Sequence, residues 1–488
     1  MDSPVLLENF AHLNPVQFLL LSILLLLSLP ASAHIGSPNV FFDGMAGSNR
    51  ITVSITPPLV VPGLASINVR VPNSAKAAVS VLPVRWDAGT KGAPPPDPAL
   101  LVKGTSNLYS AQLWLMNSGA YSVFVNVETD QGKGTAVVPL NSIAQTRQPM
   151  PPWMGTLFLT VGAILVLLLI AIVGGAVRES TLAPTALPAP PQLLRSRLAM
   201  TIATILITLV LLVGKRWWDT VDSHFRNNRL FQTGVLKASV TPGATPELEI
   251  AIEAKSWKQD ATPLVPEHGK LMHLFLVHRE DAKAFAHLHP LQTREHHFRA
   301  TLPPLPSGDY HLYADITQES GFAQTLTGMV SIAHSPSAPV TFSDEDDSFH
   351  FTATSQEEKL LRLELPQKEY RRNEQTNLLF TVHDRAGNRV LLQPYMGMYG
   401  HAIIRRHDGA VFTHLHPLGT VSMKSQELFA RREKNPRLFQ NPADLICGKP
   451  DEDLSFPYAF PETGEYHIWL QTRFHNQIHT ERFTVQVR

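Results

Sequence analysis

The sequence predicts a mainly β protein, with three immunoglobulin-like β-sandwich domains, two transmembrane α-helices and an N-terminal signal helix. Three observations predict this fold class. Short segments of alternating apolar and polar residues recur along most of the chain, two long apolar runs interrupt them, and the part after the second run contains an internal duplication. The length of 488 residues leaves room for about three domains.

The first apolar run predicts a signal peptide. Residues 17–29 (QFLLLSILLLLSL) form an apolar stretch of about 13 residues, which is shorter than a membrane span. An A-x-A pattern at residues 31–33 favours cleavage before His34, so that residues 1–33 would be removed. Because Asp2 and Glu8 precede the run and no Lys or Arg does, an uncleaved N-terminal anchor is the alternative.

Residues 34–150 are predicted to form the first extracytoplasmic β-sandwich. Three segments within them, 51–56, 65–71 and 121–127, alternate apolar and polar residues and are separated by turns rich in Pro and Gly. Short strands at this spacing are typical of an antiparallel sandwich.

Two longer apolar runs predict transmembrane helices at residues 151–178 and 197–216. The loop at 179–196 is predicted to be cytoplasmic, because arginines cluster at its ends and the positive-inside rule places such loops in the cytoplasm. These arginines are Arg178, Arg195 and Arg197. We therefore expect both flanking β regions to lie outside the cytoplasm, on the periplasmic or outer side of a bacterial inner (cytoplasmic) membrane.

The region after the helices contains a duplication, which predicts β-sandwich repeats at residues 219–335 and 338–488. The matching segments are 248–253 with 378–383, 285–290 (FAHLHP) with 412–417 (FTHLHP), and 302–312 with 458–468. The second copy carries an insertion of roughly thirty residues at about 419–454. Each copy is about the size of an immunoglobulin-like domain.

Histidine is the unusual residue of this chain: there are 21, and all but two follow residue 223. Each repeat has one histidine at the start of a predicted strand and an H-x-H-P motif thirteen or fourteen residues later. These candidate metal ligands are His273, His287 and His289 in the first repeat and His401, His414 and His416 in the second. Alternate residues of a strand point to the same side, so an H-x-H motif presents two imidazoles to one ion. If the two strands form an antiparallel hairpin, three imidazoles converge in each repeat.

Three further residues are candidate ligands. Met398 and Met423 supply thioethers near the second cluster, and a mature N-terminal His34 would offer its α-amine and its imidazole to copper. Imidazole with thioether suits copper, whereas three imidazoles suit copper or zinc equally well. The carboxylates of Asp281 and Asp408 are candidate hydrogen-bond partners of bound imidazoles. The alternative is that the histidines are structural and bond backbone carbonyls at a sheet corner.

Composition and motifs exclude several classes of function. The formal net charge is zero, which favours no nucleic-acid partner. The single cysteine, Cys447, permits neither an intrachain disulfide nor a zinc site built from cysteines. No G-x-S-x-G, H-E-x-x-H or phosphate-binding glycine loop is present, so the sequence favours a protein that is not an enzyme.

Several segments resemble parts of uncharacterised bacterial membrane proteins: 34–44 (HIGSPNVFFDG), 113–127 (LWLMNSGAYSVFVNV) and 396–423 (MGMYGHAIIRRHDGAVFTHLHPLGTVSM). The β domains are similar to the YtkA-like and FixH-like families, which are exported immunoglobulin-like modules associated with copper handling or cytochrome oxidase maturation. The predicted N-terminal histidine resembles, more weakly, that of the CopC family. The resemblance implies ligand roles for Met398, His401, His414 and His416. The first β domain lacks the further histidines of CopC-type sites.

These observations favour a membrane-embedded, extracytoplasmic metal-binding protein, with copper or else zinc as its metal. The first alternative is an immunoglobulin-like scaffold that recognises another exported protein and uses its histidines only for structure. The second is an enzyme, such as an oxidase, built on the histidine clusters.

Overall fold

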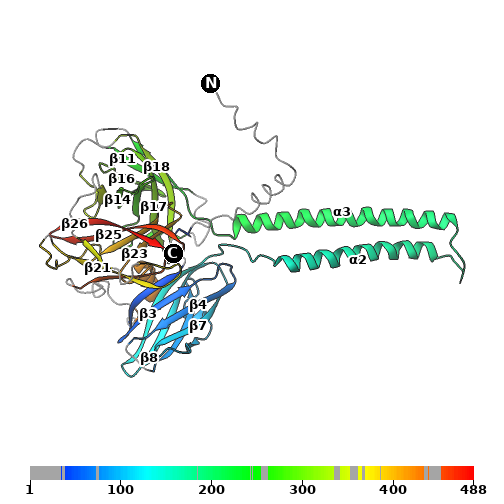
Figure 1. Cartoon of the computed structure of the whole chain (residues 1–488), viewed down its shortest axis with the longest axis horizontal. Helices are drawn as coiled ribbons and strands as arrows, with labels where there is room; N and C mark the ends of the chain where they lie inside the picture. Colours follow the sequence, from blue (N-terminus) through cyan, green and yellow to red (C-terminus); the bar gives the residue numbers. More distant parts are fainter. Residues whose placement is uncertain are drawn as a thin grey trace.

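The computed structural model describes residues 34–35, 39–72, 76–183, 185–241, 243, 246–253, 262–334, 341–351, 361–364, 369–384, 386–433, 438 and 452–488. Figure 1 shows the β domains clustered at one end of the molecule and two long helices extending from them. The predicted fold class, mainly β with two long apolar helices, is confirmed. The predicted signal segment 1–33 and Cys447 lie outside the described residues.

The first β domain is an eight-stranded arrangement in the order β2-β3-β4-β7-β6-β5-β8-β9. Its strands are β2 (Val40–Ala46), β3 (Asn49–Thr56), β4 (Gly63–Arg70), β5 (Ala78–Arg85), β6 (Asp97–Leu101), β7 (Leu108–Leu115), β8 (Gly119–Thr129) and β9 (Gly132–Ser142), with a short 3₁₀ helix η2 (Thr90–Gly92). In β3 every second side chain is buried, as the alternation of apolar residues in its sequence predicts.

Two helices, α2 (Pro152–Glu179) and α3 (Pro190–Asn228), are long and apolar enough to cross a membrane. They pack closely where Gly174 of α2 leaves room for Met200, and the Ser196 hydroxyl donates to the Gly174 carbonyl at 2.7 Å. Helix α3 is longer than the predicted span of 197–216 at both ends. Pro190 starts it, and ion pairs four residues apart, such as Lys215 with Asp219, support the turns beyond the apolar run.

The first repeat consists of two facing sheets, one in the order β10-β11-β16-β15 and one in the order β12-β17-β13-β14-β19, with β18 also paired to β17. The strands are β10 (Leu236–Thr241), β11 (Glu247–Ile252), β12 (Leu264–Val265), β13 (His273–His278), β14 (Ala284–Leu288), β15 (Leu291–Arg294), β16 (His297–Thr301), β17 (Gly308–Gln318), β18 (Ala323–Ile332) and β19 (Ser348–Phe351). Strand β19 follows the predicted start of the second repeat at residue 338 but pairs with β14, so it belongs to a sheet of the first repeat.

The second repeat has one sheet in the order β20-β21-β24 and another in the order β1-β23-β22-β25-β26. The elements are β20 (Leu361–Glu364), β21 (Thr376–Val382), β22 (His401–Arg406), β23 (Val411–Leu415), β24 (Leu454–Tyr458), β25 (Gly464–Phe474) and β26 (Gln477–Val487), together with helix α4 (Met423–Arg432) in the predicted insertion. Strand β1 (His34–Ile35) joins this sheet by pairing parallel to β23.

The two repeats pack face to face across an apolar layer that both supply. Phe275, Phe285 and Tyr313 of the first repeat contact Phe412 and Trp469 of the second. Tyr313 stacks on Phe412 with ring centroids 3.9 Å apart, and Phe285 stacks on Trp469 at 5.1 Å. Because residues 273, 275 and 277 of β13 share one face of the strand, this layer leads directly to the histidine at the start of β13.

Candidate metal centre

The predicted hairpins form in both repeats. Strand β13 pairs antiparallel with β14, placing Phe275 opposite His287, and β22 pairs with β23, placing Ile403 opposite His414. The leucine between the two histidines of each H-x-H motif is fully buried in the core of its own repeat, as expected. The histidines therefore point the other way, toward the neighbouring repeat.

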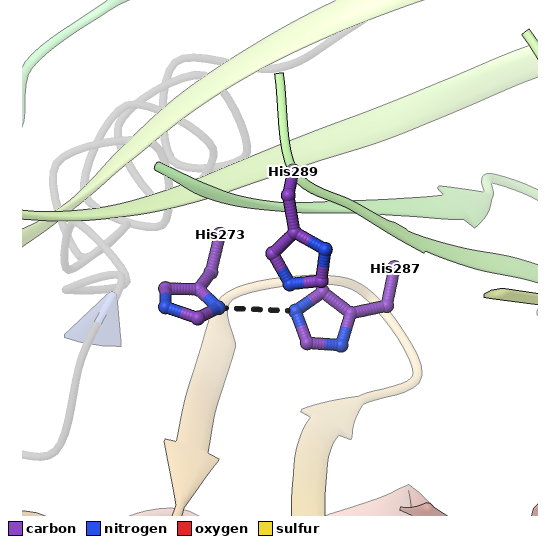
Figure 2. Close-up of side chains that lie close together, drawn as sticks. All are labelled: His273, His287 and His289. Carbon is purple, nitrogen blue, oxygen red and sulfur yellow. Dashed lines mark hydrogen bonds between the residues drawn. The ribbon is translucent and has the colours of Figure 1, made fainter. Parts of the chain in front are cut away.

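The three histidines of each repeat converge. One ring nitrogen from each of His273, His287 and His289 lies within 4.8 Å of one from each of the others, and the same holds for His401, His414 and His416. We call these the first and second triads. Figure 2 shows His273 and His287 side by side with the ring of His289 turned toward them. The closest nitrogens are 3.3 Å apart in the first triad and 3.1 Å in the second.

In the first triad the outward ring nitrogens are held by oxygen atoms. The Nε2–H of His273 donates to the carbonyl of Glu267 at 3.2 Å, and the Nδ1–H of His289 donates to Asp347 at 3.0 Å. The Nδ1–H of His287 donates to the side-chain oxygen of Gln471 at 2.8 Å, and Gln471 lies on β25 of the second repeat.

The second triad repeats this arrangement with the roles of the repeats exchanged. The Nε2–H of His401 donates to the carbonyl of Tyr395 at 3.1 Å, and the Nδ1–H of His414 donates to Asp315 at 3.2 Å. Asp315 lies on β17 of the first repeat, in register with His273, just as Gln471 lies in register with His401. Each repeat therefore orients one imidazole of the other.

The inward nitrogens of both triads carry lone pairs. A neutral imidazole has one N–H, and in five of the six rings a carbonyl, amide or carboxylate oxygen accepts it on the outward side. Burial, the largest cause, lowers the pKa of His273, His287, His401 and His414 well below the ordinary value, and it lowers the pKa of His416 to about 4. These five rings are therefore neutral near pH 7.

The Nε2 atoms of His289 and His416 have no hydrogen-bond partner among the described residues, although both are buried. An unsatisfied buried polar atom costs about 1–3 kcal/mol. These two atoms belong to the second histidine of each H-x-H motif, and both residues are members of their triads. Each triad thus brings three imidazole nitrogens close together, in an arrangement that could hold a metal ion.

The two triads lie next to each other. The ring of His414 is centred 5.9 Å from both His273 and His287 of the other repeat. Within the triads the corresponding distances run from 4.6 Å for His287 and His289 to 5.5 Å for His273 and His287. The six histidines therefore form one buried centre between the repeats.

His268 also belongs to this centre, and motif reasoning missed it. Its ring lies 5.4 Å from His416, 6.0 Å from His401 and 6.1 Å from His273 between ring centroids. A signal was present in the duplication: Pro-x-His-Gly ends four residues before His273, and Pro-x-Met-Gly ends four residues before His401. Aligning the two copies at these prolines places His268 opposite Met396.

The remaining candidate ligands are Met398, Met423 and His34. Met398 is fully buried in the turn before β22, and Met423 begins α4, where its backbone N–H donates to Glu267 at 2.8 Å. Both stay predictions as ligands. Of His34 the structure describes only the backbone, which pairs with Val411.

The expected carboxylate partners were wrong. Asp281 binds His278 at 2.8 Å, and Asp408 pairs with Arg406 at 2.7 Å. The acidic partners of the triads are instead Asp315 and Asp347, which are distant from their histidines in sequence.

A separate group of possible ligands lies at the far end of β22. His407, Glu465 and His467 bring one ligand atom each within 4.8 Å of the others. His407 and Glu465 are exposed, and the His467 Nδ1 is paired with Thr484 at 3.3 Å. This surface group is a second place where added metal can bind, and it needs a control in any titration.

Comparison with known proteins finds one family model that matches part of the chain. The sequence model of a family described as a domain of unknown function (DUF8832) matches residues 232–333 and 356–488. No curated protein is similar in sequence. Neither finding supports the resemblance to the YtkA-like, FixH-like or CopC families.

Solved structures resemble the chain only weakly. A fragment of the ICAM-5 ectodomain (D1–D4) has 9% identity over 93% of this chain and 83% of that chain, with a TM-score of 0.16. A chimeric titin Z1Z2 has 15% identity over 53% of this chain and 99% of that one, with a TM-score of 0.12. Escherichia coli alpha-2-macroglobulin has 9% identity over 90% and 33%, with a TM-score of 0.14. Such scores carry no argument about function.

Proposed function

We propose that this chain is a membrane-anchored, non-enzymatic metal-binding protein of the bacterial cell envelope, and that copper is its metal. The histidine centre between the repeats holds the ion, and the β domains lie on the periplasmic side of the inner membrane. The protein then serves metal supply, sensing or tolerance in that compartment.

One observation carries the proposal: lone pairs face each other at short range in both triads. His273 Nδ1 and His287 Nε2 lie 3.3 Å apart, and both rings donate their N–H outward. These two nitrogens are at hydrogen-bond distance (Figure 2), but when both rings donate their N–H outward neither has a proton for the other, and a cation between them would satisfy both lone pairs. Two nitrogens on a tetrahedral ion with bonds of about 2.0–2.1 Å are separated by about 3.3 Å. The spacing therefore fits a metal ion.

A purely structural role for the histidines explains less of the geometry. It accounts for the outward hydrogen bonds, but it leaves the buried Nε2 atoms of His289 and His416 unpaired in both repeats. Outward N–H groups held by oxygen are also what metal-bound histidines normally show, because the bond fixes the tautomer and the ring orientation. The immunoglobulin-like scaffold without metal remains the alternative that the experiment must exclude.

The donor set supports copper. Neutral imidazole suits copper and zinc alike, whereas thioether favours copper, and two methionines adjoin the second triad in sequence. Met398 and Met423 are the thioethers that we propose as additional ligands, with His34 as a further candidate at the mature N-terminus. Replacing both methionines by leucine is expected to lower the affinity for Cu(I) more than the affinity for Zn²⁺.

The topology proposal rests on the two helices. Three arginines lie at the ends of α2 and α3 that are far from the β domains: Arg178, Arg195 and Arg197. Two tryptophans, Trp217 and Trp218, lie on α3 toward its other end, nearer the β domains. This distribution matches the positive-inside rule and an interfacial aromatic belt. The apolar stretches contain no acid, base or histidine, so the helices anchor the protein and the β domains carry the metal.

The test is a metal titration of the full chain in detergent micelles against a competing chelator. The His407→Ala background removes the surface group. In that background we expect stoichiometric, high-affinity copper binding, and we expect it to be weakened at least tenfold in the double variants His287→Ala/His289→Ala and His414→Ala/His416→Ala. His297→Ala, at a half-buried histidine on β16, serves as the control. No stoichiometric metal, or equal binding in all variants, refutes the proposal.

A further inference from the structure

We propose that the two triads hold two first-row metal ions at the same time, as one two-ion centre in which His268 of the first repeat completes the site of the second. This inference rests on the proposed function. It adds the number of ions, their mutual proximity and a seventh ligand.

The first support is the spacing of the rings. The ring centroids of His273 and His414, which belong to different triads, are 5.9 Å apart, and those of His273 and His287, within one triad, are 5.5 Å apart. An ion bound at either triad therefore has histidines of the other triad as its immediate neighbours. Two such ions would therefore be neighbours, the arrangement in which two-metal sites share a small bridging ligand.

The second support is the charge around the centre. Asp347 bonds His289 of the first triad, Asp315 bonds His414 of the second, and Glu267 lies beside His268 and His416. Buried ions need compensating charge, because removal of an ion from water is costly unless the ion is paired. One carboxylate for each triad and a third between them suit two cations better than one.

The third support is the position of His268. It has a φ of 51°, a left-handed conformation that is uncommon for a residue with a side chain, and Gly269 follows with a φ of 81°. Strained backbone of this kind persists where the surrounding structure holds it and is frequent at ligand sites. Here Glu267 holds the turn by accepting the backbone N–H of Met423 and the hydroxyl of Ser422.

The ring of His268 then reaches across to the second repeat. Its Nε2 is buried and has no hydrogen-bond partner among the described residues. His268, Glu267 and His416 bring ligand atoms within 4.8 Å of one another. His268 is therefore placed as a fourth nitrogen donor for the second triad, supplied by the first repeat.

The same turn occurs in the second repeat with a different residue. Met396 has a φ of 48° and Gly397 a φ of 78°, so the backbone repeats that of His268 and Gly269. Where the first repeat has a histidine in this turn, the second has a methionine. The two ions would then have unequal surroundings, which predicts two distinguishable binding steps.

A cavity gives small ligands access to the centre. It has a volume of about 440 Å³ and lies where the three β domains meet. His273, His414 and His416 form part of its wall, and Asn141 of the first β domain and Ser425 of α4 form other parts. Ions can enter by this route, and so can a small bridging ligand such as hydroxide.

The test combines stoichiometry with electron paramagnetic resonance on the full chain in micelles, in the His407→Ala background. We expect two Cu(II) ions per chain. At two equivalents we expect spin coupling, seen as a loss of integrated intensity relative to two isolated ions or as a half-field signal. Binding of only one ion, or of two ions with the full intensity of isolated ions, overturns the two-ion centre but leaves the proposed function standing. Absence of stoichiometric binding refutes both.

His268 is tested by His268→Asn, because asparagine tolerates the left-handed conformation while it lacks the imidazole. Copper at the second triad should bind at least tenfold more weakly, with binding at the first triad unchanged and with an altered spectrum of the ion at the second triad. Circular dichroism and thermal unfolding establish that the variant is folded. Unchanged affinities and spectra at both equivalents overturn the role of His268.

Discussion

Asp315→Asn is the sharpest test of how the centre is built, because it is expected to weaken metal binding and to strengthen the metal-free fold. Asp315 accepts the N–H of His414 from the opposite repeat at 3.2 Å, and its other oxygen accepts the Thr325 hydroxyl at 2.5 Å. Burial, the largest cause, raises the pKa of Asp315 to about 7. Asparagine has nearly the same shape and is always neutral.

The magnitude follows from the shift in pKa. A carboxyl group whose pKa rises from 3.8 to about 7 on folding destabilises the folded state as its charge develops, and this effect is complete above pH 7. At about 1.4 kcal/mol for each pKa unit, the penalty reaches at most about 4 kcal/mol at pH 8. The side chain is 25% exposed, so we expect a smaller gain for Asn, about 1–3 kcal/mol, at pH 8 and none at pH 4.

The same change should weaken the second triad. A carboxylate behind a metal-bound histidine raises the basicity of the ligand and fixes its orientation, and loss of such a partner typically costs 10–100-fold in metal affinity. Chemical denaturation of the metal-free protein at pH 8 and pH 4, together with a chelator competition for copper, measures both effects. Asp309→Asn, on the exposed part of the same strand, is the control. Equal copper affinity, or lower stability at pH 8, would refute the reasoning.

Three further predictions follow from the same geometry. Gln471→Ala removes the acceptor of His287 across the repeat interface and should lower copper affinity about 10–100-fold, measured by the same competition; an unchanged affinity would show that this contact does not orient the ligand. Phe412→Ala opens the apolar layer between the repeats and should lower the free energy of unfolding by about 3–5 kcal/mol, whereas truncation of the exposed Leu391 should change it by less than about 0.5 kcal/mol. Burial lowers the pKa of His416 to about 4, so the folded metal-free protein resists protonation of this ring, whereas the unfolded chain accepts the proton below about pH 6.5. The free energy of unfolding should therefore fall by about 3 kcal/mol as the pH drops from 6.5 toward 4. A free energy of unfolding that stays constant between pH 7 and pH 5 would contradict this.

Local patterns predicted the hairpins and the two triads. Residues two apart on a strand share a face, so the H-x-H motifs specified which side chains point together. The same patterns failed for the hydrogen-bond partners. Asp281 and Asp408 were near in sequence, whereas Asp315 and Gln471 come from the opposite repeat.

By itself the sequence determined the duplication, the β class, the two apolar helices and the convergence of three histidines in each copy, because each depends on short-range periodicity or on similarity within the chain. Only the tertiary structure decided that the two copies dock face to face and merge their triads into one buried centre that includes His268. That docking depends on how Phe285 stacks on Trp469 and Tyr313 on Phe412, contacts between residues far apart in sequence. Alternation along a strand identifies an apolar face but does not specify which other face will cover it.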